Sequence, residues 1–262
     1  MKKLVTAACA LVAASAFAVE SANTVGYATQ AITGGSWYLV GIQFEEVGSE
    51  AATIAFDDLI TLTGVTAAAY DKQESDAAQI QYFDGVGYDL FYYINDAYDA
   101  QDNDVGHDCW AKDGYEVTAN KKAIGEGFWF KAPAAAISGT ASMTVKGQVL
   151  ADVSKTVSFT ANTWKIISNP FPTALGLQNV TTTGVTAVAY DNQESDGAQI
   201  QYFDGVGYDL YYYISDAYDA QDNDVGHDCW ARDGYITTGT QIPVGEAFWF
   251  KAKQSGTMTF AL

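Results

Sequence analysis

Hydrophobic and polar residues alternate over short stretches of this chain, a pattern typical of β-strands. Residues 79–82 and 88–94 are rich in Tyr, Phe, Leu and Ile, and the stretch between them contains Asp-Gly-Val-Gly. Two such runs joined by an Asp-Gly turn predict a β-hairpin. Side chains two apart share one face of a strand. We therefore expect a core face made of Tyr88, Leu90, Tyr92 and Ile94, and an opposite face made of Asp89, Phe91 and Tyr93.

A second aromatic strand is predicted at residues 125–131, which read Gly-Glu-Gly-Phe-Trp-Phe-Lys, and at the similar residues 245–251. Phe128 and Phe130 should face one way and Trp129 the other. A central strand would bury both faces, which is the commoner outcome for aromatic strands. An edge strand would instead leave Trp129 and Trp249 exposed as a matched pair of platforms. A short strand is also expected at residues 65–69.

The chain contains a long internal repeat. Residues 64–115 recur as residues 184–235, and only 6 of the 52 aligned positions differ. Residues 36–41 align more weakly with 163–168 at an offset of 127 instead of 120, so the first copy holds seven extra residues around 45–57. Similar closing strands are expected at 138–145 and 255–260. Such a duplication is not expected for a protein with one catalytic centre. It is expected for a tandem binding or structural module.

These patterns predict an all-β protein. The expected fold is two tandem antiparallel β-sandwich domains, of jelly-roll or immunoglobulin-like type, related by internal duplication. We expect the first domain at residues 24–146 and the second at residues 147–262.

A resemblance to a known family supports this prediction. Residues 164–172 read Trp-Lys-Ile-Ile-Ser-Asn-Pro-Phe-Pro, a tyrosine-rich strand follows, and residues 245–250 read Gly-Glu-Ala-Phe-Trp-Phe. Together these resemble the tandem β-rich modules of secreted proteins of Bacteroidota and Verrucomicrobia-type bacteria, which read W-x-L-I-x-N-P-F-P and later P-G-E-G-F-W-F. The first copy departs from this pattern at residues 41–44, which lack the Asn-Pro turn. The resemblance implies an exported β-sandwich repeat and brings no catalytic residues with it.

The N-terminus predicts export. Lys2 and Lys3 precede an apolar stretch that ends in Ala16-Phe17-Ala18, which fits a secretory signal peptide at residues 1–18. No other stretch has the 18 to 20 unbroken apolar residues of a membrane helix, so no membrane insertion is expected. The net charge of −19 argues against nucleic acid and anionic lipid as partners. We expect a secreted, extracellular or cell-surface protein.

Cys109 and Cys229 are the cysteines that remain after the predicted signal peptide, at equivalent positions of the two copies. An even count in an exported protein suggests a disulfide, which would join the two copies or two molecules. Buried free thiols are the alternative, and the sequence leaves both open.

Each copy carries a dense group of acidic residues. Closely spaced Asp and Asn side chains, with backbone carbonyls, are the usual ligands of calcium. The stretch 102–108 falls short of an EF-hand loop, because Gly106 stands one place early and no Glu lies at the twelfth position. A solvated acidic loop is the alternative to a calcium site. The candidate ligands are Asp96, Asp99, Asp102, Asp104 and Asp108, with Asp216, Asp219, Asp222, Asp224 and Asp228.

The remaining chemistry-bearing residues argue against an enzyme. His107 and Cys109 could share a strand face, and two such pairs could supply zinc ligands, but nothing in the sequence requires it. No third residue is evident to orient a Cys–His nucleophile. The chain has no phosphate-binding Gly loop followed by a helix and no Gly-x-Ser-x-Gly elbow.

Two functions fit the sequence. The first is a structural or adhesive component of the cell surface or an extracellular assembly, in which strands at 24–27 and 258–260 offer free edges to itself or to other surface proteins. The second is a tandem carbohydrate-binding module that binds polysaccharide. It would stack sugars on exposed rings, namely Trp110, Trp129, Tyr92 and Tyr93 with their copies Trp230, Trp249, Tyr212 and Tyr213.

Overall fold

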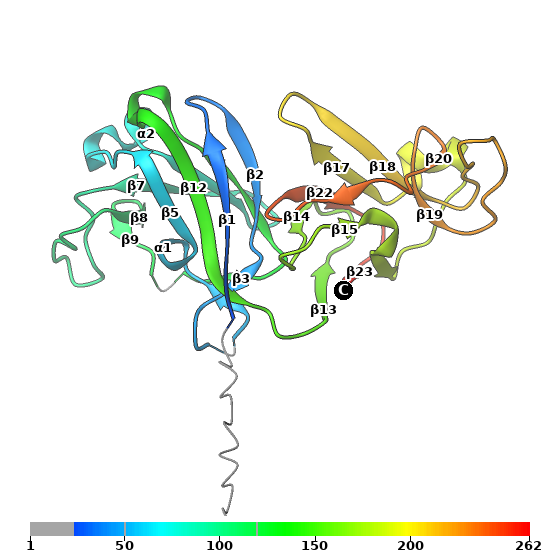
Figure 1. Cartoon of the computed structure of the whole chain (residues 1–262), viewed down its shortest axis with the longest axis horizontal. Coiled ribbons are helices and arrows are strands. Elements are labelled where there is room, and N and C mark those ends of the chain that lie inside the picture. Colours follow the sequence, from blue (N-terminus) through cyan, green and yellow to red (C-terminus); the bar gives the residue numbers. More distant parts are fainter. Residues whose placement is uncertain (1–23, 50, 119) are drawn as a thin grey trace, which may run out of the picture.

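The structure is a computed structural model that describes residues 24–49, 51–118 and 120–262. The predicted signal peptide, residues 1–18, lies outside the described residues. Regular structure is mainly β, arranged in antiparallel sheets with a few short helices, which confirms the predicted all-β class. Two neighbouring lobes are visible in Figure 1, the N-terminal half up to β12 and the C-terminal half from β13 onward.

The N-terminal half contains a six-stranded sheet, in the order β2-β11-β6-β7-β8-β9, and a four-stranded sheet in which β12 pairs with β1, β3 and β5. A short β4–β10 pair and four short helices complete it. The elements are β1 (Val25–Ile32), β2 (Trp37–Gly41), β3 (Phe44–Glu45), β4 (Thr53–Ile54), α1 (Phe56–Leu59), β5 (Ile60–Val65), η1 (Tyr70–Lys72), α2 (Gln73–Asp76), β6 (Gln79–Phe83), β7 (Tyr88–Ile94), β8 (Cys109–Lys112), β9 (Tyr115–Glu116), β10 (Lys122–Ala123), β11 (Gly127–Lys131), η2 (Ala134–Ala136) and β12 (Ile137–Val149).

The C-terminal half repeats the strand order. Its six-stranded sheet runs β14-β22-β17-β18-β19-β20, and its second sheet runs β13-β23-β16, with a short β15–β21 pair. The elements are β13 (Ser154–Phe159), β14 (Lys165–Ser168), β15 (Leu175–Gly176), η3 (Leu177–Asn179), β16 (Thr181–Thr183), η4 (Tyr190–Asn192), α3 (Gln193–Asp196), β17 (Gln199–Phe203), β18 (Tyr208–Ile214), β19 (Cys229–Arg232), β20 (Tyr235–Ile236), β21 (Gln241–Ile242), β22 (Ala247–Lys251) and β23 (Gly256–Ala261).

Each half has its own main core between its two larger sheets. In the N-terminal half, Phe128 and Phe130 of the six-stranded sheet pack in one cluster with Met143 and Val145 of β12. In the C-terminal half, Phe248 and Phe250 pack with Met258 and Phe260 of β23. Burial of these apolar faces is the main favourable term that holds the paired sheets together.

The predicted hairpin is present as β6 and β7, with Phe83 paired to Tyr88 next to the turn. The predicted core face is wrong for Tyr88 and Leu90, which are exposed, whereas Phe91 of the opposite face is fully buried. The reason is that the sheet is covered on both faces near Phe91, by the main core on one side and by a smaller core around Tyr92 and Ile94 on the other. When both faces of a strand are buried, an alternating sequence pattern does not show which face belongs to the main core.

Two other strand predictions need correction. β5 ends at Val65, so the predicted strand at residues 65–69 is wrong beyond its first residue. The C-terminal strand β23 lies between β13 and β16, so it does not offer the free edge expected at residues 258–260. The closing strand of the first copy is the long β12, which continues to Val149, three residues past the boundary predicted after residue 146. β1, in contrast, does lie at the edge of its sheet.

Candidate ligand-binding site between the two halves

The two halves meet through a pair of equivalent backbone contacts. The amide of Gly41 donates to the carbonyl of Gly245 at 2.8 Å, and the amide of Ser168 donates to the carbonyl of Gly125 at 2.8 Å. Gly41 aligns with Ser168, and Gly125 aligns with Gly245, so the second contact is the first with the two copies exchanged. The halves are therefore related by an approximate two-fold axis, as in an isologous dimer interface.

Small residues permit this close approach. A Cβ atom at Gly127 would lie 2.6 Å from the Cβ of Ala247, which is the equivalent residue of the other half. A Cβ atom at Gly41 would lie 2.6 Å from the Cβ of Ser168. Side chains larger than these would separate the two sheets, because a contact this short cannot be accommodated without backbone movement.

Aromatic rings from both halves interlock beside these contacts. Trp129 meets Phe203 edge-on with ring centres 5.1 Å apart, and Trp249 meets Phe83 in the same way at 5.2 Å. As predicted, Trp129 points away from Phe128 and Phe130. It is neither a core residue of its own half nor an open platform, since the other half covers it and leaves 8% of its surface exposed.

A cleft of about 280 Å³ lies at this aromatic interface. Because it is lined by both members of the equivalent pairs Trp129/Trp249 and Tyr88/Tyr208, the cleft spans the approximate two-fold axis. Tyr88 and Tyr208 are each 46% exposed. Burial raises the pKa of Tyr88, and the neighbouring Tyr208 phenol raises it further. The lining residues are Trp37, Gln81, Tyr88, Trp129, Phe203, Tyr208 and Trp249.

The cleft suits a small neutral ligand that has both apolar and polar faces. All seven lining side chains are uncharged. Indole and phenyl rings offer apolar surfaces for stacking, and two phenol groups and the amide of Gln81 offer hydrogen bonds. A few polar groups in a mostly aromatic concavity are typical of small-molecule sites, although this cleft is smaller than the roughly 300–1,000 Å³ of pockets for drug-sized ligands.

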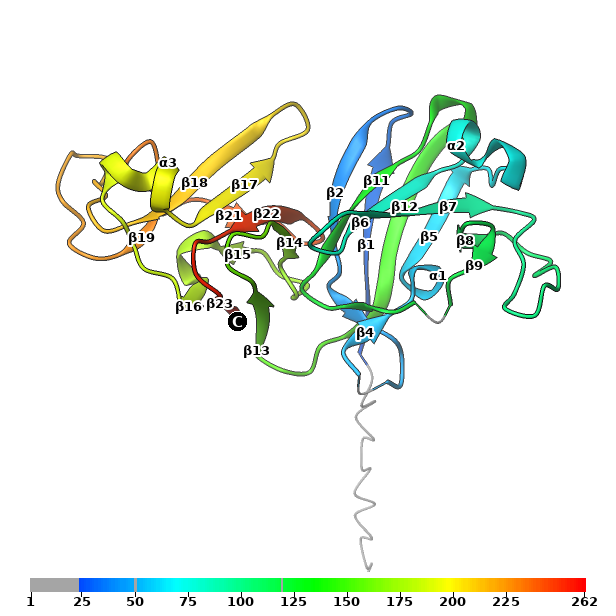
Figure 2. The ribbon, with the colours of Figure 1, turned by 180° about the vertical axis from the view of Figure 1, so that it is seen from behind.

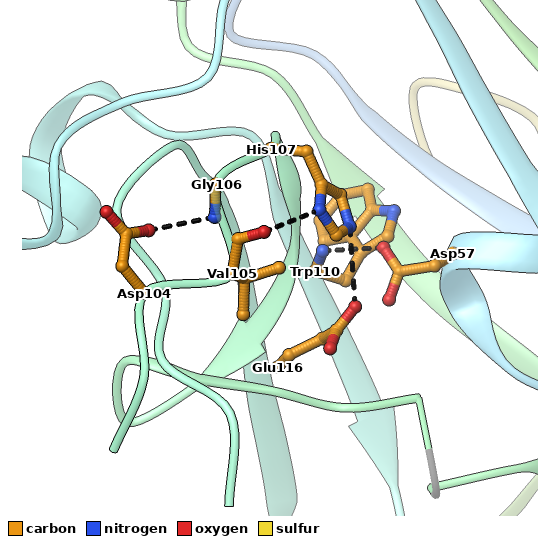
Figure 3. Close-up of polar contacts among 7 residues, drawn as sticks. All are labelled: Asp57, Asp104, Val105, Gly106, His107, Trp110 and Glu116. Carbon is orange, nitrogen blue, oxygen red and sulfur yellow. Dashed lines mark hydrogen bonds and ion pairs between the residues drawn. The ribbon is translucent and has the colours of Figure 1, made fainter. Parts of the chain in front are cut away.

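The predicted stacking role is wrong for Trp110 and Trp230, since each exposes only 1% of its surface inside its own half. Figure 3 shows the surroundings of Trp110, whose backbone amide donates to Asp57 Oδ1 at 2.7 Å. In the C-terminal half the amide of Trp230 donates to Gln178 Oε1 at 3.2 Å. Both indole rings pack in the hydrophobic cores of their own halves. Tyr92 and Tyr212 are likewise buried.

The predicted calcium ligands lie in loops where their carboxylates accept local hydrogen bonds. Asp99 Oδ1 accepts from the amides of Gln101 and Asn103, and these bonds lower the pKa of Asp99. Asp104 Oδ1 accepts from the amide of Gly106, as Figure 3 shows. Asp219 and Asp224 make the same bonds in the second copy.

Four of the other six candidate ligands also accept hydrogen bonds within the protein. Asp96 accepts from the amide of Tyr70, and Asp102 accepts from the hydroxyl of Tyr115. Asp216 and Asp222 repeat these two bonds, and Asp108 and Asp228 are exposed. Within residues 24–49, 51–118 and 120–262, no three His, Cys, Asp or Glu side chains converge as metal ligands would. Calcium binding stays a prediction, for which the loops offer no assembled ligand set.

His107 and Cys109 do not point to one site. The imidazole is exposed, with Nδ1 3.0 Å from the carbonyl oxygen of Val105 and Nε2 3.5 Å from Glu116 Oε1 (Figure 3). Cys109 is fully buried, and burial raises the pKa of its thiol to about 12. Cys109 and Cys229 are both free and buried, which is the second of the two alternatives that the sequence left open, and among the described residues no disulfide joins the two copies.

No protein-family model, curated protein or solved structure matches this chain. In the part of the chain that the structure describes, no helix has the length and apolar character needed to cross a membrane.

Sequence reasoning singled out two of the cleft residues, Trp129 and Trp249, and missed the rest. The available signal was the hairpin turn. Phe83 and Tyr88 flank an exposed Asp-Gly-Val-Gly tip where no core of the same half is expected, and Phe203 and Tyr208 do the same in the second copy. Aromatic residues at both ends of an exposed turn indicate a contact outside their own sheet.

Proposed function

We propose that this chain is an exported, non-enzymatic adhesive protein of the cell surface or of an extracellular assembly, which holds a sugar unit of a polysaccharide in the aromatic cleft. The observation that carries the proposal is the cleft itself, an uncharged concavity built by equivalent Trp and Tyr residues of both halves. Sugar rings combine apolar C–H faces with hydroxyl groups, and this combination matches indole surfaces next to phenol and amide groups.

The proposal includes a duplicated architecture, with β-sandwich domains at about 24–146 and 147–262. Near-identity of residues 64–115 and 184–235 and the shared strand order of the two large sheets support it. The approximate two-fold relation between the halves supports it further, because duplicated copies retain the surfaces through which two identical chains would have paired. The ligand site then belongs to the pair of domains, since neither copy alone supplies both rims of the cleft.

Binding is favoured over catalysis by the side chains that line the cleft. None of the seven is a carboxylate, histidine, cysteine or serine, the groups that usually act as general acid, general base or nucleophile. The same seven residues include aromatic rings and an amide, which are groups that bind neutral glycans.

The test is affinity electrophoresis through gels that contain neutral polysaccharides, one per gel. At least one polysaccharide should retard the wild-type chain. The double variant Tyr88→Ala/Tyr208→Ala should migrate without retardation. The matched control is Tyr98→Ala/Tyr218→Ala, because these tyrosines are also 46% exposed and do not line the cleft. Equal retardation of both variants would overturn the assignment of the cleft.

A second candidate is self-assembly through β1. This edge strand has eight residues without a charged side chain, and Val25 and Tyr27 are 60% and 78% exposed. Natural proteins usually protect such edges, because unpaired strands join those of neighbouring molecules. Light scattering of the mature chain in millimolar calcium and then in chelator tests this candidate and the calcium prediction together. Growth that Tyr27→Lys abolishes would support assembly, and a monomer in both solutions would exclude it.

A further inference from the structure

Two cavities flank the aromatic cleft at equivalent positions. The Glu126 cavity, of about 140 Å³, is lined by Tyr82, Asp84 and Glu126 of the N-terminal half and by Trp164 and Lys165 of the other half. The Glu246 cavity, of about 490 Å³, is lined by the equivalent residues with the halves exchanged, namely Tyr202, Asp204, Glu246, Trp37 and Tyr38. One substitution distinguishes their charges, since Tyr38 stands where the other cavity has Lys165.

The Glu126 cavity contains its own cation. Lys165 Nζ lies 3.0 Å from Glu126 Oε1, and it also donates to the carbonyl of Ser158 at 3.2 Å. The hydroxyl of Tyr82 donates to Glu126 Oε2 at 2.6 Å. Both oxygens of this half-buried carboxylate are therefore paired within the protein.

The carboxylate of Glu246 has no equivalent lysine beside it, because Tyr38 occupies that position. The hydroxyl of Tyr38 accepts a hydrogen bond from the amide of Thr33 at 2.7 Å, and its ring packs toward Phe130. Among the described residues, no side chain donates to the Glu246 carboxylate and no basic side chain lines its cavity. Burial raises the pKa of Glu246, because a partly desolvated carboxylate without a cation is disfavoured in its charged form.

An external cation would supply what Lys165 supplies in the other half. Opposite charges at a partly buried site attract more strongly than at an open surface, and aromatic walls add cation–π attraction. The protein already makes such contacts with the equivalent indoles, since Lys131 Nζ lies 5.1 Å from the ring centre of Trp37 and Lys251 Nζ lies 5.4 Å from that of Trp164. The larger volume of the Glu246 cavity leaves room for a side chain or a sugar-borne amine.

We infer that the Glu246 cavity binds a primary ammonium group of an external ligand, at the place where Lys165 sits in the Glu126 cavity. The Glu246 cavity shares Trp37 and Phe203 with the aromatic cleft, but the inference does not rest on the neutral-sugar proposal, because Glu246 does not line the cleft. The ammonium group can belong to a lysine side chain of a partner or to an amino sugar, and both present the same group to the carboxylate.

The test uses Nα-acetyl-lysine N-methylamide, which keeps its ε-ammonium group, as the probe at pH 8 and low salt, with binding followed by NMR. The wild-type chain should bind it in the millimolar range and should not bind the uncharged N-acetyl-norleucine methylamide. Glu246→Gln should weaken binding at least tenfold, and Tyr38→Lys should abolish it by placing an internal ammonium in the cavity. Glu126→Gln and Tyr38→Phe are the controls, and both should bind the probe like the wild type.

A second comparison identifies the source of the ammonium group. A glucosamine oligomer that binds more tightly than the lysine probe, while its N-acetylated form does not, would assign the site to amino sugars. The opposite order would assign it to lysine side chains. Binding of norleucine equal to that of lysine, or unchanged binding in folded Glu246→Gln and Tyr38→Lys, would overturn the inference. Chain folding is checked for each variant by circular dichroism.

Discussion

Trp129 of the N-terminal half lies edge-on against Phe203 of the C-terminal half, with ring centres 5.1 Å apart and an angle of 73° between the rings. The equivalent pair Trp249 and Phe83 has nearly the same geometry, at 5.2 Å and 70°. The two contacts are equivalent because each copy of the repeat contributes one tryptophan and one phenylalanine. Figure 2 shows β11 and β22, which carry the tryptophans, from behind.

A double-mutant cycle should detect this contact between the halves. Trp129→Leu and Phe203→Leu each remove one ring, and we expect a coupling free energy of about 1 kcal/mol between them, as for other edge-on aromatic pairs. Unfolding by urea measures each variant. The control cycle pairs Trp129→Leu with Tyr98→Leu, whose effects should add because Tyr98 does not belong to the interface cluster. Additive effects in the first cycle would show that the halves do not meet through these rings.

Asp57 should make the protein less stable as the pH rises. Burial raises the pKa of Asp57 to about 6 from the ordinary 3.8, although the bond from the Trp110 amide opposes the shift. The folded chain thus binds an extra proton between these values, so this group's stabilising contribution is complete below about pH 4 and is lost as the pH passes 6. A shift of this size corresponds to about 3 kcal/mol.

Asp57→Asn should remove that dependence and stabilise the chain at pH 8, by up to about 3 kcal/mol. The C-terminal half already uses a neutral amide here, since Gln178 accepts the bond from the Trp230 amide. Unfolding free energies at pH 4 and pH 8 check the prediction. Asp71→Asn is the control, because Asp71 is exposed, does not act on the Asp57 carboxyl and should have little effect at either pH. A variant less stable than wild type at pH 8 would contradict the assignment.

Cys109 and Cys229 should be unreactive in the folded chain. Both thiols are buried, and burial raises the pKa of Cys109 to about 12 and also raises that of Cys229. Because the thiolate is the reactive form, a maleimide at pH 7.5 should label neither residue until denaturant is added, and then should label both. Mass spectrometry of the labelled chain is the measurement. Rapid labelling without denaturant, or no labelling after unfolding without reductant, would contradict the buried free thiols.

Gln43 should be replaceable with a gain in stability. Its amide nitrogen and oxygen are both buried and have no hydrogen-bond partner among the described residues. Unpaired buried polar atoms cost about 1–3 kcal/mol, so Gln43→Met should raise the unfolding free energy by about 1 kcal/mol or more. Gln148→Met is the matched control and should destabilise, because the amide of Gln148 binds Glu45 and Gly48. Destabilisation by both substitutions would indicate that Gln43 is paired in solution.

The strands could be predicted from the sequence because aromatic and β-branched runs, separated by Gly and Asp turns, match local β geometry. The hairpin of β6 and β7 and the opposite orientations of Phe128 and Trp129 follow from such local rules. The exposure of Tyr88 and the burial of Phe91 could not be predicted, because both depend on what covers each face. Local alternation carries no information about contacts with a distant sheet.

The site was harder to predict than the fold. Trp129 and Phe203 are far apart in the sequence and meet only because two copies pack around an approximate two-fold axis. Trp110 was a candidate stacking residue because it is a tryptophan in a predicted strand, yet it is buried inside its own half, and its copy Trp230 is buried to the same extent. The charge difference between the flanking cavities depends on one aligned pair, Tyr38 and Lys165. It could not be predicted from the sequence, because each of these residues lines a cavity with a glutamate of the other half.

The most direct test of the aromatic cleft is the stoichiometry of saccharide binding, measured by isothermal titration calorimetry with a short oligosaccharide of the polysaccharide that retards the chain. A single cleft shared by both halves predicts one oligosaccharide per chain, and Tyr88→Ala should weaken the same event that Tyr208→Ala weakens. Two equal sites per chain, or one event that neither substitution changes, would contradict a binding site at the interface.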